Sequence, residues 1–474
     1  MAARVRVTRK GIVKASVTRP STIVAVSNLD LLRQGLPIVL FCVYPSTPGG
    51  GCGFHEVAAA FEAKLPSLLD HFFSLAGRIV ADPRSGLPEL HCDNQGAELV
   101  VGEVDVALGS LDYGDLDASL LRIGVPVQYG ADVVLSLQLV SFACGGFAVA
   151  WGSHHLAVDG CALSMIANAW SELARSGTIA AAPNLDRSVF RPRAPPTYSS
   201  SVGKLFMPLE RERLVNALTA STSKVGRTYY VEEQDLAMLR AQAAQAGGRA
   251  TLLEAVCAYM WKVFAAVVGS SDEKCRMGWW VDGRRRRRLT TTAPAAMRNY
   301  VGNVITYGVA EASMEGIRRL PLPGVASMVH ESIKSAVNDE HFQELVDWVE
   351  EHKGAARYVE TATVGMGSPV LSVSSLASFR LDTDFGFGRA TLVTWLDEME
   401  VEKEEEKEMD WGRLSSGFVK IVARPGGSCW FFGMSIWPSL AAAFDSDEQH
   451  IFKPLTAEYL GLVAGAKNSR ASRL

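Results

Sequence analysis

A histidine pair and an aspartate give the first indication of chemistry in this chain. The run Gly152–Gly160 reads GSHHLAVDG and contains His154, His155 and Asp159. A β-like run precedes it and a helical pattern follows, so these residues lie where a strand ends and a helix begins. A side chain at such a junction projects from a rigid scaffold into a cleft, where reacting groups are commonly held. Because the unperturbed pKa of histidine is about 6.5, His155 is a candidate general base.

Other interpretations of the same residues stay open at this point. Asp159 could be the N-cap of the following helix, with Gly160 easing the turn. The spacing could also suit a metal ion, but the other histidines form no ligand-spaced cluster, which argues against one. On spacing alone, a packed histidine without a catalytic role explains His155 about as well as catalysis does.

A second unusual segment, Asp384–Gly388, reads DFGFG. Its two glycines, Gly386 and Gly388, indicate a backbone in an unusual conformation or one that another segment approaches closely. The Asp-Phe-Gly of protein kinases is excluded because no glycine-rich phosphate loop and no His-Arg-Asp loop accompany it. A third segment, Val281–Arg284, reads VDGR and follows an apolar run typical of a buried strand.

Two runs of charge are compositionally unusual. Residues 397–410 read DEMEVEKEEEKEMD, which is typical of a solvated acidic loop or helix without a chemical role. Residues 284–288 are all arginine, which a solvated loop, a phosphate contact or a nuclear signal would each explain.

The elements that must position these residues follow from the hydrophobic pattern. Strands at 133–142 and 147–153, joined by a glycine turn, lead into a helix over about 161–175. Thr251 and Glu254 form a capping box that opens a helix to about Val268. The other expected elements are a helix at 68–75 with Ser67 as N-cap, helices at 325–337 and 342–352, and strands at 277–281, 370–373 and 430–436. Strands and helices are mixed throughout, which predicts α/β or α+β layers.

Length and composition limit the classes of protein. A chain of 474 residues favours two or three domains, and the stretch 182–202, rich in Pro, Arg and Ser, is the best linker. The net charge of −4 gives no field that would attract nucleic acid or an anionic membrane. No apolar run is long enough to cross a membrane, and basic residues interrupt any secretory signal. Eight scattered cysteines without a CxxC pair are typical of a reducing compartment.

In this order and spacing, the segments resemble the plant BAHD acyltransferase family. His155–Gly160 matches the family's HxxxDG motif, and Asp384–Gly388 matches its DFGWG motif, with Phe387 where tryptophan is usual. HxxxD alone also occurs in chloramphenicol acetyltransferases and condensation domains, but the second motif favours this family. The resemblance covers nearly the whole chain and includes Leu75–Arg78, Phe142–Gly146, Pro195–Pro196, Asp282–Arg284 and Tyr300–Asn303.

The resemblance implies an α/β (mixed α+β) fold of two similar-sized chloramphenicol-acetyltransferase-like domains. Each is expected to be a mixed β-sheet flanked by helices, with an active-site channel between the two. We expect an N-terminal domain at 1–182 carrying HxxxDG, a linker or crossover at 183–226, and a C-terminal domain at 227–474 carrying DFGFG. The family also implies a monomer.

The resemblance further implies roles for single residues. His155 would act as general base on the acceptor's hydroxyl or amine, and alignment of the already activated thioester would supply much of the acceleration. Asp159 would point away from the substrate and support the catalytic loop. Asp384, with Gly386 and Gly388, would be structural and would pair with Arg284. Lys262 and Arg284 are weaker candidates for binding the phosphates of CoA. Acyl-CoA would be a co-substrate, with neither a metal nor a permanently bound cofactor.

Departures from the family bear on the substrates. Members that use shikimate carry Ser-Trp-x-Arg before DFGWG, whereas the aligned segment here is Ser375–Ser378, without the arginine, and Arg380 is two positions away. A carboxylated acceptor such as shikimate or quinate is therefore less expected. Aromatic donors (hydroxycinnamoyl- or benzoyl-CoA) lead by family frequency, with acetyl- or malonyl-CoA as the alternative. Whether the acceptor is an alcohol or an amine is left open. The rival hypothesis is a catalytically silent relative that binds small molecules.

The expected location is the cytoplasm. The chain ends in Ser472–Leu474, which reads SRL and is close to the Ser-Lys-Leu peroxisomal address, so the peroxisome is the alternative. No nucleic-acid or membrane partner is expected.

Overall fold

The computed structural model describes residues 4–46, 53–209, 223–244, 249–268, 273–284, 297, 299–336, 339–355, 358–364, 368–379, 381, 383–396 and 416–463. The acidic run 397–410, the arginines at 285–288, Arg380 and the C-terminal tripeptide lie outside the described residues. The expectations for those segments stay predictions.

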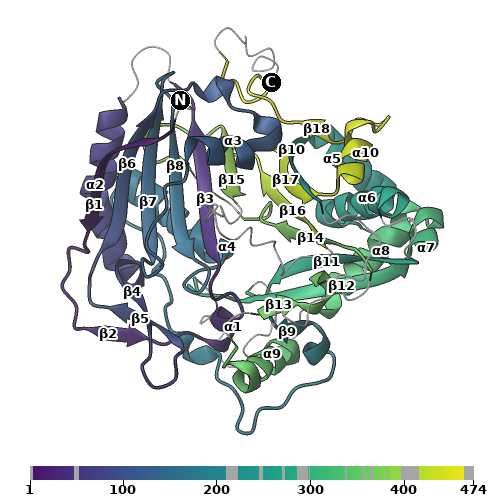
Figure 1. The fold of residues 1–474 in the computed structure, drawn as a ribbon, viewed down its shortest axis with the longest axis horizontal. Helices are drawn as coiled ribbons and strands as arrows, with labels where there is room; N and C mark the ends of the chain where they lie inside the picture. Colours follow the sequence, from purple (N-terminus) through teal and green to yellow (C-terminus); the bar gives the residue numbers. More distant parts are fainter. Residues whose placement is uncertain are drawn as a thin grey trace.

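The first part of the chain builds a six-stranded sheet in the order β1-β6-β7-β8-β3-β15 (Figure 1). The pair β6 and β7 is parallel, and the other neighbours are antiparallel. Helices α2 (Phe54–His71) and α4 (Gly160–Ser176) contact each other and share one apolar core with the sheet. The strands are β1 (Arg6–Val13), β3 (Pro37–Tyr44), β6 (Ala97–Val104), β7 (Leu135–Phe142), β8 (Phe147–His154) and β15 (Leu392–Leu396).

The second part builds a seven-stranded sheet in the order β12-β11-β14-β16-β17-β10-β18. Its central strands β11, β14 and β16 are parallel to one another, and the outer pairs are antiparallel. The strands are β10 (Val225–Val231), β11 (Lys274–Asp282), β12 (Ile305–Ser313), β14 (Val370–Ser375), β16 (Ser416–Ala423), β17 (Trp430–Ile436) and β18 (Lys453–Pro454). Its helices are α5 (Glu233–Ala243), α6 (Leu252–Val267), α7 (Met314–Arg319), α8 (Leu322–Ser335) and α10 (Pro438–Asp445).

Smaller elements lie around the two sheets. Helix α1 (Asn28–Leu31) contacts α9 (Asp339–His352), and residues of both join a third apolar core with the linker residues Phe190 and Val202. The others are α3 (Leu116–Ile123), a sheet of β2 (Thr22–Val24), β4 (Arg78–Ala81) and β5 (Pro88–Cys92), and a pair of β9 (Phe206–Pro208) and β13 (Tyr358–Glu360).

One strand of the second part belongs to the first sheet. The chain passes through DFGFG and enters β15, which pairs antiparallel with β3. In Figure 1, β15 lies on the side of the first sheet that faces the second sheet. The two sheets are therefore joined by an exchanged strand as well as by the linker.

The mixed α/β architecture with two sheet-rich domains confirms the expected fold class. The predicted strands before and after the glycine turn, helix α4 and the Thr251–Glu254 capping box are also confirmed. The helix predicted at 68–75 with Ser67 as N-cap is wrong, because α2 runs through Pro66 from Phe54. Buried apolar residues on both sides of Pro66 keep the helix continuous despite the hydrogen bond that proline removes. None of the helices in the described ranges is long and apolar enough to span a bilayer.

Candidate active site

His155 lies directly after the last residue of β8, a strand hydrogen-bonded on both sides by β3 and β7. Its backbone N–H donates to the carbonyl of Leu36 at 2.7 Å, just before β3 begins. Helix α4 starts five residues later at Gly160. The side chain is thus carried by a rigid strand end, as the sequence predicted for the junction.

Asn303 fixes the tautomer of His155. The Nδ1 atom of His155 lies 3.0 Å from Oδ1 of Asn303. The Nδ2 group of Asn303 donates to the His155 carbonyl and to the carboxylate of Asp30, at 2.6 and 2.9 Å. Both of those partners can only accept, so the Asn303 oxygen must face the ring. Nδ1 of His155 therefore carries the proton, and Nε2 of the neutral ring keeps a lone pair.

A buried network holds Asn303 in turn. The carboxylate of Asp30 accepts from the backbone N–H of Asn303 at 2.8 Å and from Nη1 of Arg187 at 2.9 Å. Asp30 also caps α1 in a box with Ser27. Arg187 comes from the linker, where it also donates to the carbonyl of Ala157 on the His155 loop. The linker thus helps to orient the histidine.

Asp159 is turned into the protein rather than towards His155. One carboxylate oxygen accepts from the N–H of Ala162 at 2.9 Å, which confirms the N-cap interpretation. The guanidinium of Arg284 binds both oxygens, at 2.7 and 3.1 Å, and the N–H of Val304 donates at 3.1 Å. Asp159 therefore ties the loop that carries His155 to the second sheet through a buried, two-point ion pair.

The predicted pair between Asp384 and Arg284 is wrong. Arg284 also contacts Asp282 at 2.9 Å, and it donates to the carbonyls of Tyr300 and Gly302, so the whole guanidinium is occupied without Asp384. Arg284 follows β11, which places it beside the Asp159 loop.

Asp384 lies in the turn that leads into β15. Its carboxylate accepts from the N–H of Gly386 at 3.1 Å, and its carbonyl accepts from Ser171 on α4 at 2.8 Å. Gly386 and Gly388 have φ values of +92° and +90°, so the predicted unusual backbone is confirmed. Phe385 is buried in the first core. The DFGFG segment therefore anchors the start of β15 to α4 and to the core of the first sheet.

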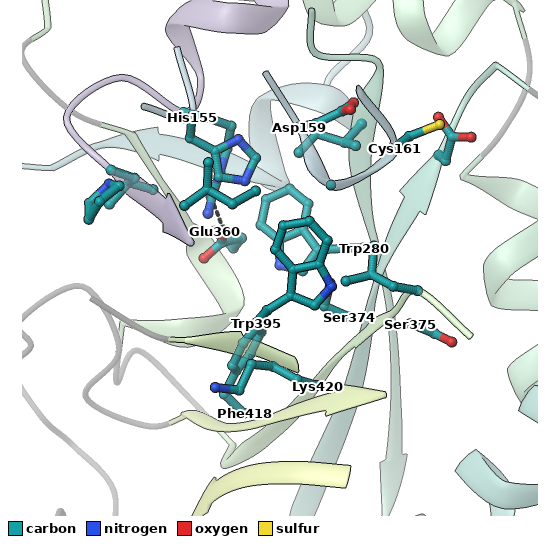
Figure 2. A pocket seen from close by; sticks show the side chains of 18 of the residues that line it. His155, Asp159, Cys161, Trp280, Glu360, Ser374, Ser375, Trp395, Phe418 and Lys420 are labelled. Carbon is teal, nitrogen blue, oxygen red and sulfur yellow. Dashed lines mark hydrogen bonds and ion pairs between the residues drawn. The ribbon is translucent and has the colours of Figure 1, made fainter. Parts of the chain in front are cut away.

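A cavity of about 390 Å³ lies between the two parts of the chain and contains His155 (Figure 2). This size is within the usual range for small-molecule sites. The first part contributes Arg33, Leu36, Pro37, Ile38, His155, Asp159, Gly160 and Cys161. The second part contributes Lys224, Trp280, Asp282, Ile305, Tyr358, Val359, Glu360, Ser374, Ser375, Leu376, Phe379, Trp395, Leu396, Ser416, Phe418, Lys420 and Ser435.

The electrostatic surroundings keep His155 neutral. The pKa of His155 is lowered to about 4, chiefly by burial and secondly by the nearby Arg33 guanidinium, while Asp159 and the hydrogen bond to Asn303 oppose the change. Arg33 stacks over the ring of Trp280 and contacts Glu360 at 3.1 Å. An imidazole of this kind is unprotonated near pH 7 and ready to accept a proton at Nε2.

The neighbouring His154 is separated from this chemistry. It lines a second cavity, of about 610 Å³, with Tyr129 and Leu156, and burial lowers its pKa. Successive residues at the end of a strand point to opposite sides, which explains why only one of the two histidines faces the shared cavity.

Lys262 is not brought to the site. Its ammonium group donates to the carbonyls of Ile317, Arg318 and Leu320 at 3.0, 3.0 and 2.5 Å, at the C-terminal end of α7. Lys262 therefore completes a helix terminus, and its predicted contact with CoA phosphates has no support in this placement. Within the described ranges, no group of three or more His, Cys, Asp or Glu residues is arranged to bind a metal ion.

Sequence reasoning missed Asn303, Asp30 and Arg33. Asn303 is the last residue of Tyr300–Asn303, a segment that resembles the family, but the resemblance implied no role for it. Asp30 carries a readable signal, because Ser27 and Asp30 have the spacing of a capping box. Arg33 follows this short helix and has no motif that would have identified it.

Comparison with known proteins places the chain in a family. The Transferase family model matches residues 3–400. A hydroxycinnamoyltransferase of Narcissus pseudonarcissus is 28% identical over 398 residues, covering 80% of this chain and 87% of the relative. A hydroxycinnamoyl-CoA:5-hydroxyanthranilate N-hydroxycinnamoyltransferase of Avena sativa is 28% identical over 406 residues, covering 81% and 89%. The crystal structure of F. graminearum TRI101 complexed with ethyl coenzyme A has the same fold, with a TM-score of 0.68 at 14% identity, covering 92% of this chain and 99% of that chain. This chain belongs to the Transferase family, the BAHD acyl-CoA-dependent acyltransferases that its motifs resemble.

Proposed function

We propose that the protein transfers an aromatic acyl group, of hydroxycinnamoyl or benzoyl type, from CoA to the hydroxyl or amine of a small acceptor. The observation that carries the mechanism is the Asn303 contact, which leaves the lone pair of His155 on Nε2 beside the shared cavity. The relatives support the substrate class, since their names specify hydroxycinnamoyl transfer and an amine acceptor. The cavity supports it too, because Trp280, Trp395 and Phe418 can pack against an aromatic acyl group.

The chemical steps follow from this tautomer. Nε2 of His155 takes the proton of the acceptor as its oxygen or nitrogen forms a bond to the thioester carbonyl carbon. The tetrahedral oxyanion collapses, the carbon–sulfur bond breaks, and the leaving thiolate takes the proton back from Nε2. During the transfer the ring is positively charged, and its Nδ1–H bond to Asn303 becomes stronger. Asp159 and Arg284 hold the loop in place throughout.

The low pKa of His155 suits the step in which the leaving thiolate takes the proton back from Nε2. A weakly basic imidazole gains little driving force when it removes a proton, but it is a good acid toward the departing thiolate. Because a thioester is already activated, orientation of acceptor, base and carbonyl is expected to supply much of the acceleration.

The test measures release of free CoA thiol from hydroxycinnamoyl-, benzoyl-, acetyl- and malonyl-CoA with a panel of alcohols and amines. We expect acceptor-dependent release, largest with the aromatic donors, that falls by about 100- to 10,000-fold in His155→Ala. His154→Gln is the matched control and should keep the activity, because His154 lines the other cavity. Equal activity of wild type and His155→Ala on every pair would contradict the proposal.

A further inference from the structure

Asp282 is a buried aspartate in the wall of the shared cavity. It is the last residue of β11, it lines the cavity together with His155, and its side chain is only 12% exposed. Its Oδ2 atom is buried and has no hydrogen-bond partner among the residues that the structure describes. A buried polar atom without a partner costs free energy, so a donor supplied by a ligand would explain this oxygen.

The other oxygen of Asp282 shares a guanidinium with Asp159. Nη1 of Arg284 donates to Oδ1 of Asp282 at 2.9 Å and to Oδ2 of Asp159 at 2.7 Å. Burial raises the pKa of Asp282, although Arg284 opposes the change. Because one guanidinium serves two carboxylates here, a second cation beside Asp282 would stabilise its charged form.

The cationic side chains of the cavity lining do not supply this second cation. Arg33 and Lys420 form ion pairs with other carboxylates, and Lys224 also has an interaction partner. None of the three donates to Oδ2 of Asp282, since no described residue does. A cation that binds this oxygen would therefore come from a ligand in the cavity.

Asp282 lies close to the loop that carries His155. Asp159, which shares Nη1 of Arg284 with Asp282, follows His155 by four residues. Trp280, labelled in Figure 2, lies two residues before Asp282 on β11, so both side chains leave the strand on the same face and line the cavity. A short hydrocarbon chain that runs from His155 to Asp282 can pack against this indole.

We infer that Asp282 binds an ammonium group of the acceptor, while the acceptor's reacting amine or hydroxyl faces His155. The group on Asp282 keeps its proton, whereas the reacting group is neutral when it attacks the thioester. CoA brings anionic phosphates and neutral amides, and the proposed acyl groups carry no positive charge, so the cation belongs to the acceptor. This inference rests on the proposed acyl transfer and names the acceptor class for it, which is diamines and amino alcohols.

The inference bears on two expectations from the sequence. A carboxylated acceptor was less expected because Ser375–Ser378 lacks the arginine of the Ser-Trp-x-Arg block. The carboxylate of Asp282 would repel such an acceptor as well. The choice between an alcohol and an amine was left open, and a cationic acceptor can react through either group. The inference therefore defines the end of the acceptor that is remote from the reaction.

The experiment compares acceptors that differ only at this remote end. Diaminopropane, diaminobutane, diaminopentane and diaminohexane are each compared with the alkylamine and the amino alcohol of the same chain length. The donor is one CoA thioester with an uncharged aromatic acyl group, and formation of the amide is followed by mass. The ratio of kcat/KM for the diamine over the alkylamine is measured in wild type and Asp282→Asn. Asp347→Asn is the matched control, because Asp347 is also buried and paired with an arginine but lies outside the cavity lining.

The ratio should depend on chain length and on the charge of Asp282. In wild type it should be largest at one chain length, because His155 and Asp282 are held at a fixed separation. At that length, Asp282→Asn should lower it by about 10- to 100-fold, because a hydrogen bond between charged groups is lost. The ratio of the amino alcohol over the alkylamine should change less, since the asparagine oxygen still accepts from a hydroxyl. Asp347→Asn should leave both ratios unchanged.

Binding in the absence of acyl transfer is the second readout. Calorimetric titration with the same diamines and alkylamines, without acyl-CoA, should show a preference for the diamine in wild type and none in Asp282→Asn. Wild type without a preference for the diamine at any chain length would overturn the inference, even if Asp282→Asn does not fold. An Asp282→Asn variant that keeps the wild-type ratio would overturn it too. Loss of all His155-dependent CoA release would instead contradict the proposed function, and the calorimetry would then still decide the role of Asp282.

Discussion

Replacing Asn303 by alanine should weaken catalysis through His155 alone. The change removes the acceptor that fixes the proton on Nδ1 and that stabilises the charged ring during transfer. Hydrogen bonds to charged groups contribute about 1.5–3 kcal/mol, so kcat/KM should fall about 10- to 150-fold, less than in His155→Ala. The backbone N–H of Asn303 still donates to Asp30, so we expect the variant to fold with about 1–3 kcal/mol less stability.

The assay is initial-rate CoA release over a pH series, with urea unfolding beside it. Asn303 opposes the lowering of the His155 pKa, so its loss should move the acid limb of the rate profile to lower pH. Asn28→Ala is the matched control, because Asn28 is also buried and donates to the Val346 carbonyl, but does not contact His155. That variant should lose stability without moving the acid limb.

A double variant decides whether Asn303 acts through His155. If it does, adding Asn303→Ala to His155→Ala should reduce the residual activity no further. Asn303 does not act through His155 if Asn303→Ala lowers activity by the same factor with and without His155, or if the acid limb of the rate profile stays where it is in wild type.

Three further outcomes are expected. Wild-type kcat/KM should stay level down to about pH 5 and fall about tenfold per pH unit below about 4, as rate measurements with a stable acyl-CoA would show. The free energy of unfolding, measured by urea titration, should fall by up to about 3 kcal/mol as the pH drops from about 6.5 to about 4. The reason is that His155 in the unfolded chain binds a proton in this range, whereas the buried ring does not. The His155→Gln variant should lose this pH dependence. Arg33→Met should move the acid limb of the rate profile to higher pH, because Arg33 lowers the pKa of His155. Arg276→Met is the control and should leave the acid limb unchanged, because Arg276 forms its ion pair with Glu311.

Local elements could be predicted from the sequence, because the necessary signals lie within a few residues of one another. The change from strand to helical period around His155, the N-cap at Asp159 and the Thr251 capping box are of this kind. The positive φ of Gly386 and Gly388 could be predicted for the same reason. The helix expected to begin after Ser67 begins instead at Phe54, because buried apolar residues on both sides of Pro66 keep the helix continuous.

The orientation of the site could not be predicted from the sequence. Asn303 is 148 positions from His155, and Arg187 is 157 positions from Asp30. Such contacts depend on the order of strands in two sheets and on the exchanged β15, which no local pattern specifies. The charge partner of Arg284 was misassigned for the same reason, since a carboxylate's sequence position does not say which cation it meets.

The revised partner of Arg284 leads to a last prediction. Arg284→Met would leave the carboxylates of Asp159 and Asp282 buried without their guanidinium. Breaking a buried pair on one side costs about 3–5 kcal/mol, so urea unfolding should show a loss of that size. The catalytic loop would also lose its tie to the second sheet, and kcat should fall with the stability.

A double-mutant cycle tests which aspartate is the partner. Arg284→Met and Asp159→Asn should show a coupling energy of about 1–3 kcal/mol, because they share one ion pair. Arg284→Met and Asp384→Asn should be additive within about 0.5 kcal/mol, because Asp384 serves the turn into β15 instead. Strong coupling of Arg284 to Asp384, with additivity toward Asp159, would restore the pairing that the sequence suggested and would leave the position of the catalytic loop unexplained.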